Sequence, residues 1–114
     1  MGLADSEAYW EVNLSPRGDW NIYHLQGYRQ GLQAEMAIKT LPLVVNAAPL
    51  GSPQPGFELQ AVLNGATLFA VDQPIHLGIT AVIQDQEGAL SYWALRHCGS
   101  EPDFHLRESF ALKL

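Results

Sequence analysis

The chain has 114 residues, of which 47% are hydrophobic, and a formal net charge of −6 at pH 7. This length fits one domain over residues 1–114, and this hydrophobic content argues against a disordered chain. Its six Lys and Arg residues are scattered singly and no apolar run approaches the ~18 residues of a membrane span, so the composition argues against nucleic-acid and membrane partners.

A single cysteine, Cys98, rules out a disulfide within the chain and fits a reducing compartment. The first ten residues lack the basic start and the apolar core of a secretory signal. We therefore expect a cytoplasmic protein.

Residues 8–25 predict a β-hairpin and hold the densest group of aromatic side chains. Trp10, Val12 and Leu14 alternate with other residues, which is the two-residue period of a strand with one buried face. A turn containing Pro and Gly follows, and residues 20–25 are again rich in strand formers. We expect this hairpin to lie at the centre of the fold.

The middle of the chain predicts turns and short strands. Gly27 and Gly31 indicate turns or a bulge. Residues 34–39 fit either a short strand or a single helical turn, and residues 43–45 favour a strand. Residues 47–56 hold three of the seven prolines and predict a surface loop.

Three later segments alternate clearly. Residues 57–63 place Phe57, Leu59, Ala61 and Leu63 on one face. Residues 75–84 and 90–97, separated by a polar turn, predict a second hairpin. The last residues, 109–114, are expected to turn Phe110, Leu112 and Leu114 inward. Turn signals about every ten residues predict an all-β fold, an antiparallel β-sandwich of jelly-roll or immunoglobulin-like outline with little or no helix.

Two stretches resemble a known family. The first is Tyr9-Trp10-Glu11-Val12-Asn13 followed by Ser15-Pro16, Gly18 and Trp20. The second runs from Leu90-Ser91-Tyr92-Trp93-Ala94-Leu95 through Pro102-Asp103-Phe104-His105 to Phe110-Ala111-Leu112. Together they are similar to the bacterial DOMON-like branch of the DOMON and family 9 carbohydrate-binding module superfamily.

The resemblance implies a β-sandwich that binds sugars or haem, or that has no assigned ligand. Members of this family usually carry further strands before the hairpin, whereas this chain begins almost at the hairpin. We expect that a sandwich without those strands exposes sheet edges and apolar surface, which favours a homo-oligomer.

Sugar sites combine flat aromatic rings with amide, carboxylate or guanidinium groups. The same aromatic residues are common in the cores of small β-domains. Trp20 and Tyr28 lie nearest the turns, and we expect them to be the exposed pair. The candidate ligand-binding residues are Trp20, Tyr28, Tyr23, Trp93, Arg96 and Asn13.

Other chemistries have weaker signals. The four histidines lack the spacing of a zinc site, so no metal is predicted. Haem ligation by Met36 and His105 is an alternative, although no haem motif selects this pair. The other reading of His105 is that it fixes its loop by hydrogen bonds, with Asp103 forming a turn. Cys98 has no motif of a catalytic nucleophile around it, so we expect no enzyme.

Three functions follow from these patterns. The first is a non-enzymatic module that binds a carbohydrate or a similar small ligand without a cofactor. An alternative from another class is a structural module that self-associates through exposed sheet edges. A haem-binding domain is the third.

Overall fold

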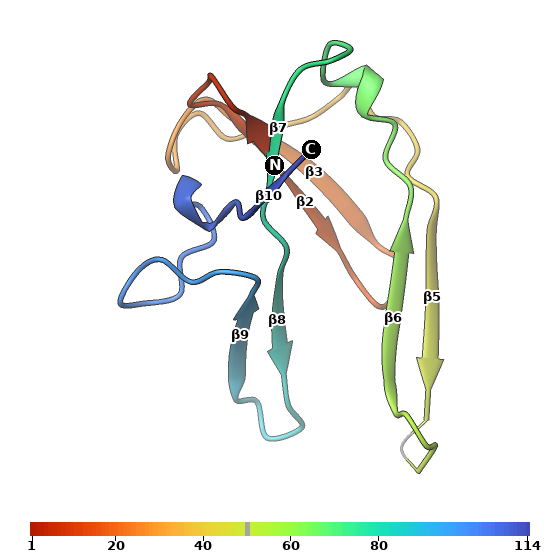
Figure 1. Ribbon diagram of the computed structural model, residues 1–114. Coiled ribbons are helices and arrows are strands. Elements are labelled where there is room, and N and C mark those ends of the chain that lie inside the picture. Colours follow the sequence, from red (N-terminus) through yellow and green to blue (C-terminus); the bar gives the residue numbers. More distant parts are fainter. Residues whose placement is uncertain (50) are drawn as a thin grey trace.

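The computed structural model describes residues 1–49 and 51–114 (Figure 1). Within them the regular elements are short antiparallel strands and two 3-10 turns. The elements are β1 (Gly2–Leu3), β2 (Tyr9–Leu14), β3 (Trp20–Leu25), β4 (Gln33–Ala34), β5 (Leu43–Ala48), β6 (Gly56–Ala61), η1 (Gly65–Thr67), β7 (Ile75–Leu77), β8 (Thr80–Gln84), β9 (Leu90–Ala94), η2 (Arg107–Ser109) and β10 (Leu112–Lys113). The predicted all-β, antiparallel fold is confirmed.

A six-stranded sheet forms the body of the molecule, with the strand order β10-β7-β1-β2-β3-β4. The predicted first hairpin is its longest pairing, since β2 and β3 pair from Tyr9 with Leu25 to Leu14 with Trp20. Both β1 and β10 pair with β7, so the two ends of the chain lie on either side of this strand (Figure 1). Because β2 and β3 lie inside the sheet and both core clusters include their side chains, the expected central position of the hairpin is confirmed.

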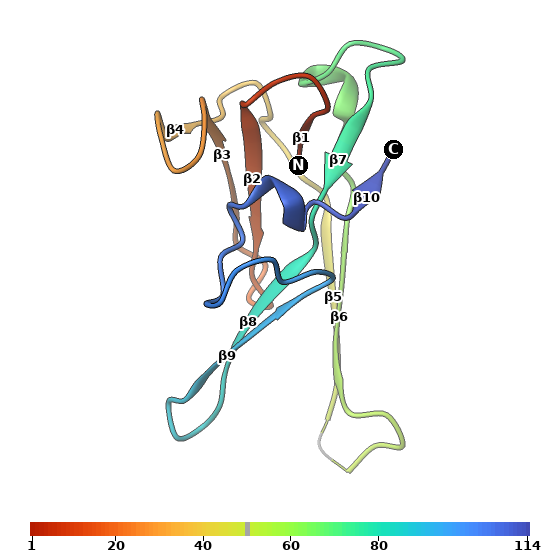
Figure 2. The same cartoon turned by 60° about the vertical axis from the view of Figure 1, so that its left-hand side comes forward.

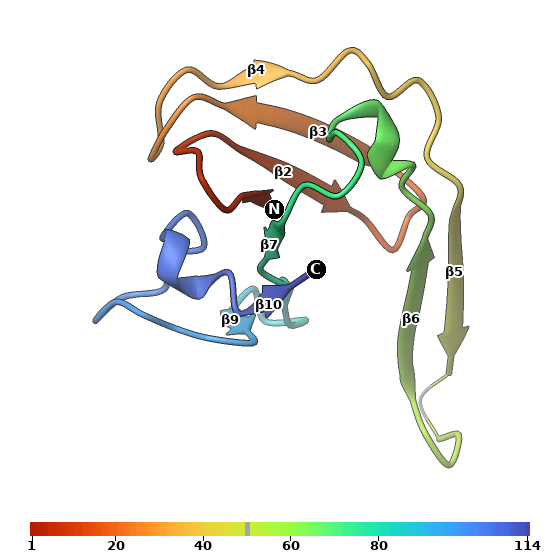
Figure 3. The same cartoon turned by 45° about the horizontal axis from the view of Figure 1, so that its top comes forward.

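The core lies on both faces of the β2–β3 hairpin. On one face, Trp10 and Ile22 pack with Ile38, Leu41 and Phe69. Figure 3 shows β2, β3 and β4 as a curved layer with the η1 segment beside it.

On the other face, Tyr9 and Leu25 pack against Phe110 from the end of the chain. The beginning of β2 is thus buried on both sides, and Leu25 is 1% exposed. Beyond this point both sides of β2 become more exposed together, from half-buried Glu11 and Val12 to exposed Asn13 and Leu14.

Two further hairpins, β5–β6 and β8–β9, form separate two-stranded sheets. Both extend away from the six-stranded sheet and stand apart from each other in Figures 1 and 2. The predicted second hairpin is confirmed at β8–β9, but residues 75–84 are not one strand. The run breaks between β7 and β8 at Gly78, where an added Cβ would lie 3.2 Å from the Phe110 ring. The chain end crossing at this point explains the break.

The expectation that Leu112 and Leu114 face inward is wrong. Phe110 is buried, but Leu114 is 73% exposed, because β10 is an edge strand that pairs only with β7. Among residues 34–39, only Ala34 belongs to a strand, the short β4. The predicted loop 47–56 is shorter, since β5 extends to Ala48; its Leu50 lies outside the described residues. In the described part of the chain, no helix has the length and apolar character to cross a bilayer.

Candidate functional site

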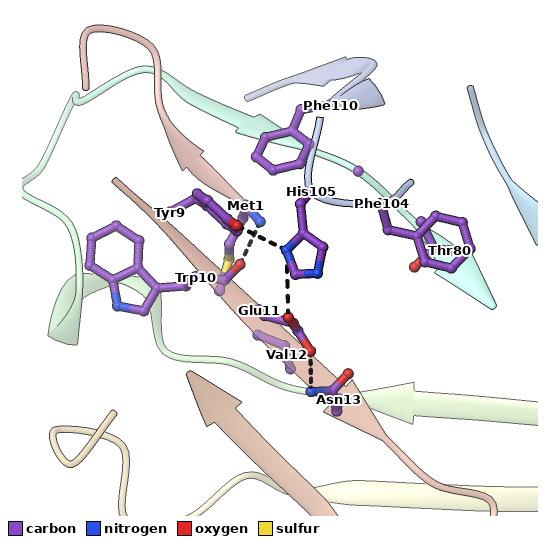
Figure 4. Close-up of a pocket in the computed structure, with 11 residues that line it drawn as sticks. Met1, Tyr9, Trp10, Glu11, Val12, Asn13, Thr80, Phe104, His105 and Phe110 are labelled. Atoms are coloured by element: carbon purple, nitrogen blue, oxygen red, sulfur yellow. Dashed lines mark hydrogen bonds and ion pairs between the residues drawn. The ribbon is translucent and has the colours of Figure 1, made fainter. Parts of the chain in front are cut away.

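A small pocket lies between β2 and the segment that precedes β10 (Figure 4). Its volume is about 140 Å³. The polar side chains that line it are Tyr9, Glu11 and Asn13 of β2, Thr80 of β8 and His105, while Phe104 and Phe110 contribute rings. Tyr9, Glu11 and Asn13 alternate along β2, so all three point to the same side of the strand.

These polar groups form a connected chain. The Tyr9 hydroxyl lies 2.8 Å from Nδ1 of His105, and Oε2 of Glu11 lies 4.0 Å from the same nitrogen. Asn13 donates its amide to Oε1 of Glu11 at 2.7 Å and to Oδ1 of Asn21 at 2.9 Å. Burial raises the pKa of Tyr9, so its hydroxyl stays protonated at neutral pH. The groups largely satisfy one another, and few remain free for a ligand.

The size of the pocket limits what it can hold. Sites for small organic molecules usually measure about 300–1,000 Å³. The 140 Å³ pocket is well below that range and suits ordered water better than a sugar ring. We therefore treat it as a packing feature that joins the chain end to β2.

The loop before η2 is held by Asp103. Its Oδ1 accepts the backbone N–H of His105 at 2.9 Å and lies 3.2 Å from Nη2 of Arg29. The Tyr28 hydroxyl donates to its other oxygen. This hydrogen bond from Tyr28, together with those from His105 and Arg29, lowers the pKa of Asp103. The predicted roles of His105 and Asp103 in fixing this loop are confirmed.

The candidate ligand-binding residues do not form one cluster. We expected Trp20 to be exposed, but it packs beside the core. Trp20 pairs with Leu14, and this pair lies on the same face of the hairpin as Trp10 and Ile22. Tyr23 packs against the second core cluster. Asn13 is the one candidate that lines the pocket.

The other three candidates lie elsewhere. Tyr28 is exposed in the turn after β3, where it binds Asp103. Trp93 is exposed on β9, and Arg96, beyond β9, donates to the carbonyl of Glu108 at 3.3 Å. Trp93 therefore lies away from the pocket, on the exposed surface of the β8–β9 hairpin.

The residues of the haem alternative are also separate. Met36 is exposed beyond β4 and does not line the pocket, whereas His105 bonds Tyr9 inside it. Cys98 is a free, exposed thiol. Over residues 1–49 and 51–114, no three His, Cys, Asp or Glu side chains are grouped as metal ligands.

The most prominent surfaces are the bare apolar sides of the two projecting hairpins. The register of β8–β9 places Ser91 and five apolar residues on one side, and we call these apolar residues the Trp93 face. The Trp93 face consists of Ile79, Ala81, Ile83, Trp93 and Leu95. On it, Trp93 is 61% exposed and Ile83 is 53% exposed.

The β5–β6 hairpin carries a second such surface, which we call the Phe57 face. The Phe57 face consists of Val45, Ala47, Phe57 and Leu59. It continues Leu43 and Ala61, whose side chains pack against the core at the base of the hairpin. Phe57, near the tip, is 71% exposed. The sequence predicted the alternation of Phe57 with Leu59 and of Ile79 with Ala81 and Ile83, but placed Ala47 in a loop and gave no signal that these surfaces would stay uncovered.

The total surface is larger than a folded monomer of this size normally has. The accessible area is 8188 Å², against about 6,200 Å² expected for 12.5 kDa. The radius of gyration is 15.4 Å, against about 13 Å expected for 114 residues. The excess, about 2,000 Å², arises because the two hairpins project from the body (Figure 2).

Comparison of the chain with protein-family models, curated proteins and solved structures gave no significant match. Function must therefore be inferred from the surfaces described above.

Proposed function

We propose that this protein is a non-enzymatic association module that forms homo-oligomers through its projecting hairpins. The observation that carries the proposal is the uncovered apolar surface of β8–β9 and β5–β6. Exposed apolar patches of this extent mark interaction sites in soluble proteins.

The excess accessible surface area of about 2,000 Å² is large enough for a stable protein interface. Specific interfaces bury about 1,200–2,000 Å² in total, and obligate homodimers bury more. If each chain covered its excess of about 2,000 Å², a pair would bury an area in the obligate range. Isolated two-stranded hairpins are also marginal in water, so both hairpins gain stability from a covering layer.

Charge supports the same conclusion. The chain carries a net charge of −6, which opposes association in general. However, β8 and β9 contain no charged residue, and Glu58 is the single charge within β5 and β6. Depletion of charge in the central part of a surface is typical of protein interfaces.

Light scattering coupled to size-exclusion chromatography tests the proposal over a hundredfold range of concentration. We expect a mass of at least twice 12.5 kDa. Ile83→Asp places a charge on the Trp93 face and should weaken association by about a hundredfold. Val71→Asp is the matched control, because Val71 is 85% exposed but lies outside both hairpins. A wild-type monomer at every concentration would refute the proposal.

A second candidate is binding of a small carbohydrate, as the family resemblance implies. One observation favours it: Glu11, Asn13, Asn21 and Tyr23 share one face of β2–β3 and place amide and carboxylate groups beside a ring. Titration with monosaccharides, followed by amide NMR shifts, tests it. Shifts confined to these four residues and abolished by Asn13→Ala would support the sugar site, and a spectrum unchanged at millimolar sugar would exclude it.

A further inference from the structure

The two apolar surfaces differ in how much covering they need. The reverse side of the β5–β6 hairpin is mainly polar, since Asn46, Glu58 and Gln60 lie there beside Val44 and Ala48. A hairpin of this kind needs one covering layer. The reverse side of β8–β9 is more apolar, since Val82, Leu90, Tyr92 and Ala94 lie there beside Thr80 and Gln84. Apolar side chains on both sides are typical of strands covered by two layers.

The same chain already begins to cover one side of β8–β9. Phe104, from the loop after β9, lies with its ring 6.3 Å from that of Tyr92. Tyr92 is accordingly less exposed than Trp93 on the opposite side. Val82 and Leu90 on this side stay more than half exposed. The Trp93 face has no comparable ring contact among the described residues, and we take it as the side of β8–β9 available to another molecule.

We infer that a second copy of the chain covers the Trp93 face, and that the Trp93 face of one copy packs on the Phe57 face of the other. This inference rests on the proposed self-association and specifies its geometry. In a two-fold pair both contacts form at once, because each copy offers one of each surface. Pairing like hairpins, β5–β6 on β5–β6 or β8–β9 on β8–β9, leaves the other apolar surface bare in both copies.

Side-chain sizes on the two surfaces favour this pairing. Each surface holds one large ring beside a small residue, since Trp93 opposes Ala81 and Phe57 opposes Ala47 in their hairpins. Facing sheets pack at about 10 Å when large side chains of one layer enter spaces over small ones of the other. Each ring can then lie over the alanine of the facing copy.

Cysteine crosslinking with a short bismaleimide tests the arrangement, since facing sheets lie about 10 Å apart and a direct disulfide needs Cα atoms within about 7 Å. In a Cys98→Ser background, one chain carries Ala47→Cys and an isotope-labelled second chain carries Ala81→Cys. The two chains are expressed separately, mixed until subunits exchange, and then crosslinked. We expect the mixed crosslink to exceed either like crosslink by about tenfold, as a reciprocal contact requires. Asn46→Cys, on the reverse side of β5, is the matched control and should crosslink to Ala81→Cys much less.

Three results would overturn the inference in distinguishable ways. Dominance of like crosslinks, with the mass of the untreated protein still dimeric, would reject this geometry and leave self-association standing. A monomeric mass before crosslinking would reject self-association itself. A crosslink within one chain of the Ala47→Cys, Ala81→Cys double variant, at monomer mass, would show that the two hairpins close on each other and would reject both.

Discussion

At the scale of single residues, Asp103 links parts of the chain that are distant in sequence. It holds Tyr28 and Arg29 in the turn after β3 and caps the backbone of His105 in its own loop. Hydrogen bonds to a carboxylate are stronger than those between neutral groups. Asp103 therefore attaches the last segment to the β2–β3 hairpin, together with the buried Phe110 and the His105–Tyr9 hydrogen bond.

The lowered pKa of Asp103 predicts a specific pH dependence. A carboxyl with a depressed folded pKa adds stability above its unfolded value, 3.8, and loses it as the pH falls through the folded value. Asp103→Asn should thus lower the free energy of unfolding by about 1 kcal/mol at pH 7. The difference from the wild type should shrink below about pH 4.

Urea unfolding at several pH values measures this effect. Glu101→Gln, in the same exposed loop, removes the same charge and serves as the control. Equal destabilisation by the two variants, or a deficit in Asp103→Asn that persists at low pH, would contradict the assigned role.

At the scale of elements, the β2–β3 hairpin depends on its turn. Gly18 has a φ of 90°, in a region that side chains with a Cβ rarely adopt. The backbone closes around it, since the Gly18 N–H donates to the carbonyl of Ser15 at 2.9 Å and the Ser15 N–H donates to that of Asp19 at 2.9 Å. The turn fixes the register that sets which side chains of β2 enter each of the two core clusters.

Replacing Gly18 by alanine should cost about 1 kcal/mol of unfolding free energy, because the added Cβ strains the backbone. No neighbouring atom lies within 4 Å of that Cβ, so packing does not contribute. Gly27→Ala is the matched control, because its Cβ is equally free and its φ is not in the positive region. Equal midpoints for the two variants in urea unfolding would mean that the turn tolerates the strain.

At the scale of the whole molecule, the protein has a small core and two long projections. The two core clusters lie on the β2–β3 hairpin, while the tips of β5–β6 and β8–β9 carry exposed apolar side chains. A molecule of this shape is expected to be more stable when a partner covers the projections, because binding to the folded state alone raises its stability.

Mass action predicts that the melting temperature rises with protein concentration. A hundredfold increase adds about 2.7 kcal/mol of unfolding free energy per dimer. The Ile83→Asp variant should show a smaller rise over the same range, and Val71→Asp should match the wild type. Differential scanning calorimetry measures this; equal melting temperatures at all concentrations for the wild type would speak against association.

The sequence by itself determined the class of fold and much of its local pattern. The two-residue period places Trp10 and Val12 on one side of β2, and the structure has them there because backbone geometry alone fixes the alternation. The same holds for Phe57 and Leu59 on β6. The local pattern predicted one strand over residues 75–84, whereas the structure breaks it at Gly78, where Phe110, more than thirty residues away, packs close to the backbone.

Only the tertiary structure decided what covers each apolar face. Alternation marks Ile22 and Ile83 alike as apolar positions of strands, yet Ile22 is buried and Ile83 is exposed. The difference depends on whether another segment of the chain reaches that face, which is a property of the topology and not of the local pattern. For the same reason the aromatic candidates, similar in sequence, separate into Trp20 beside the core, Tyr28 bound to Asp103, and Trp93 on a bare surface.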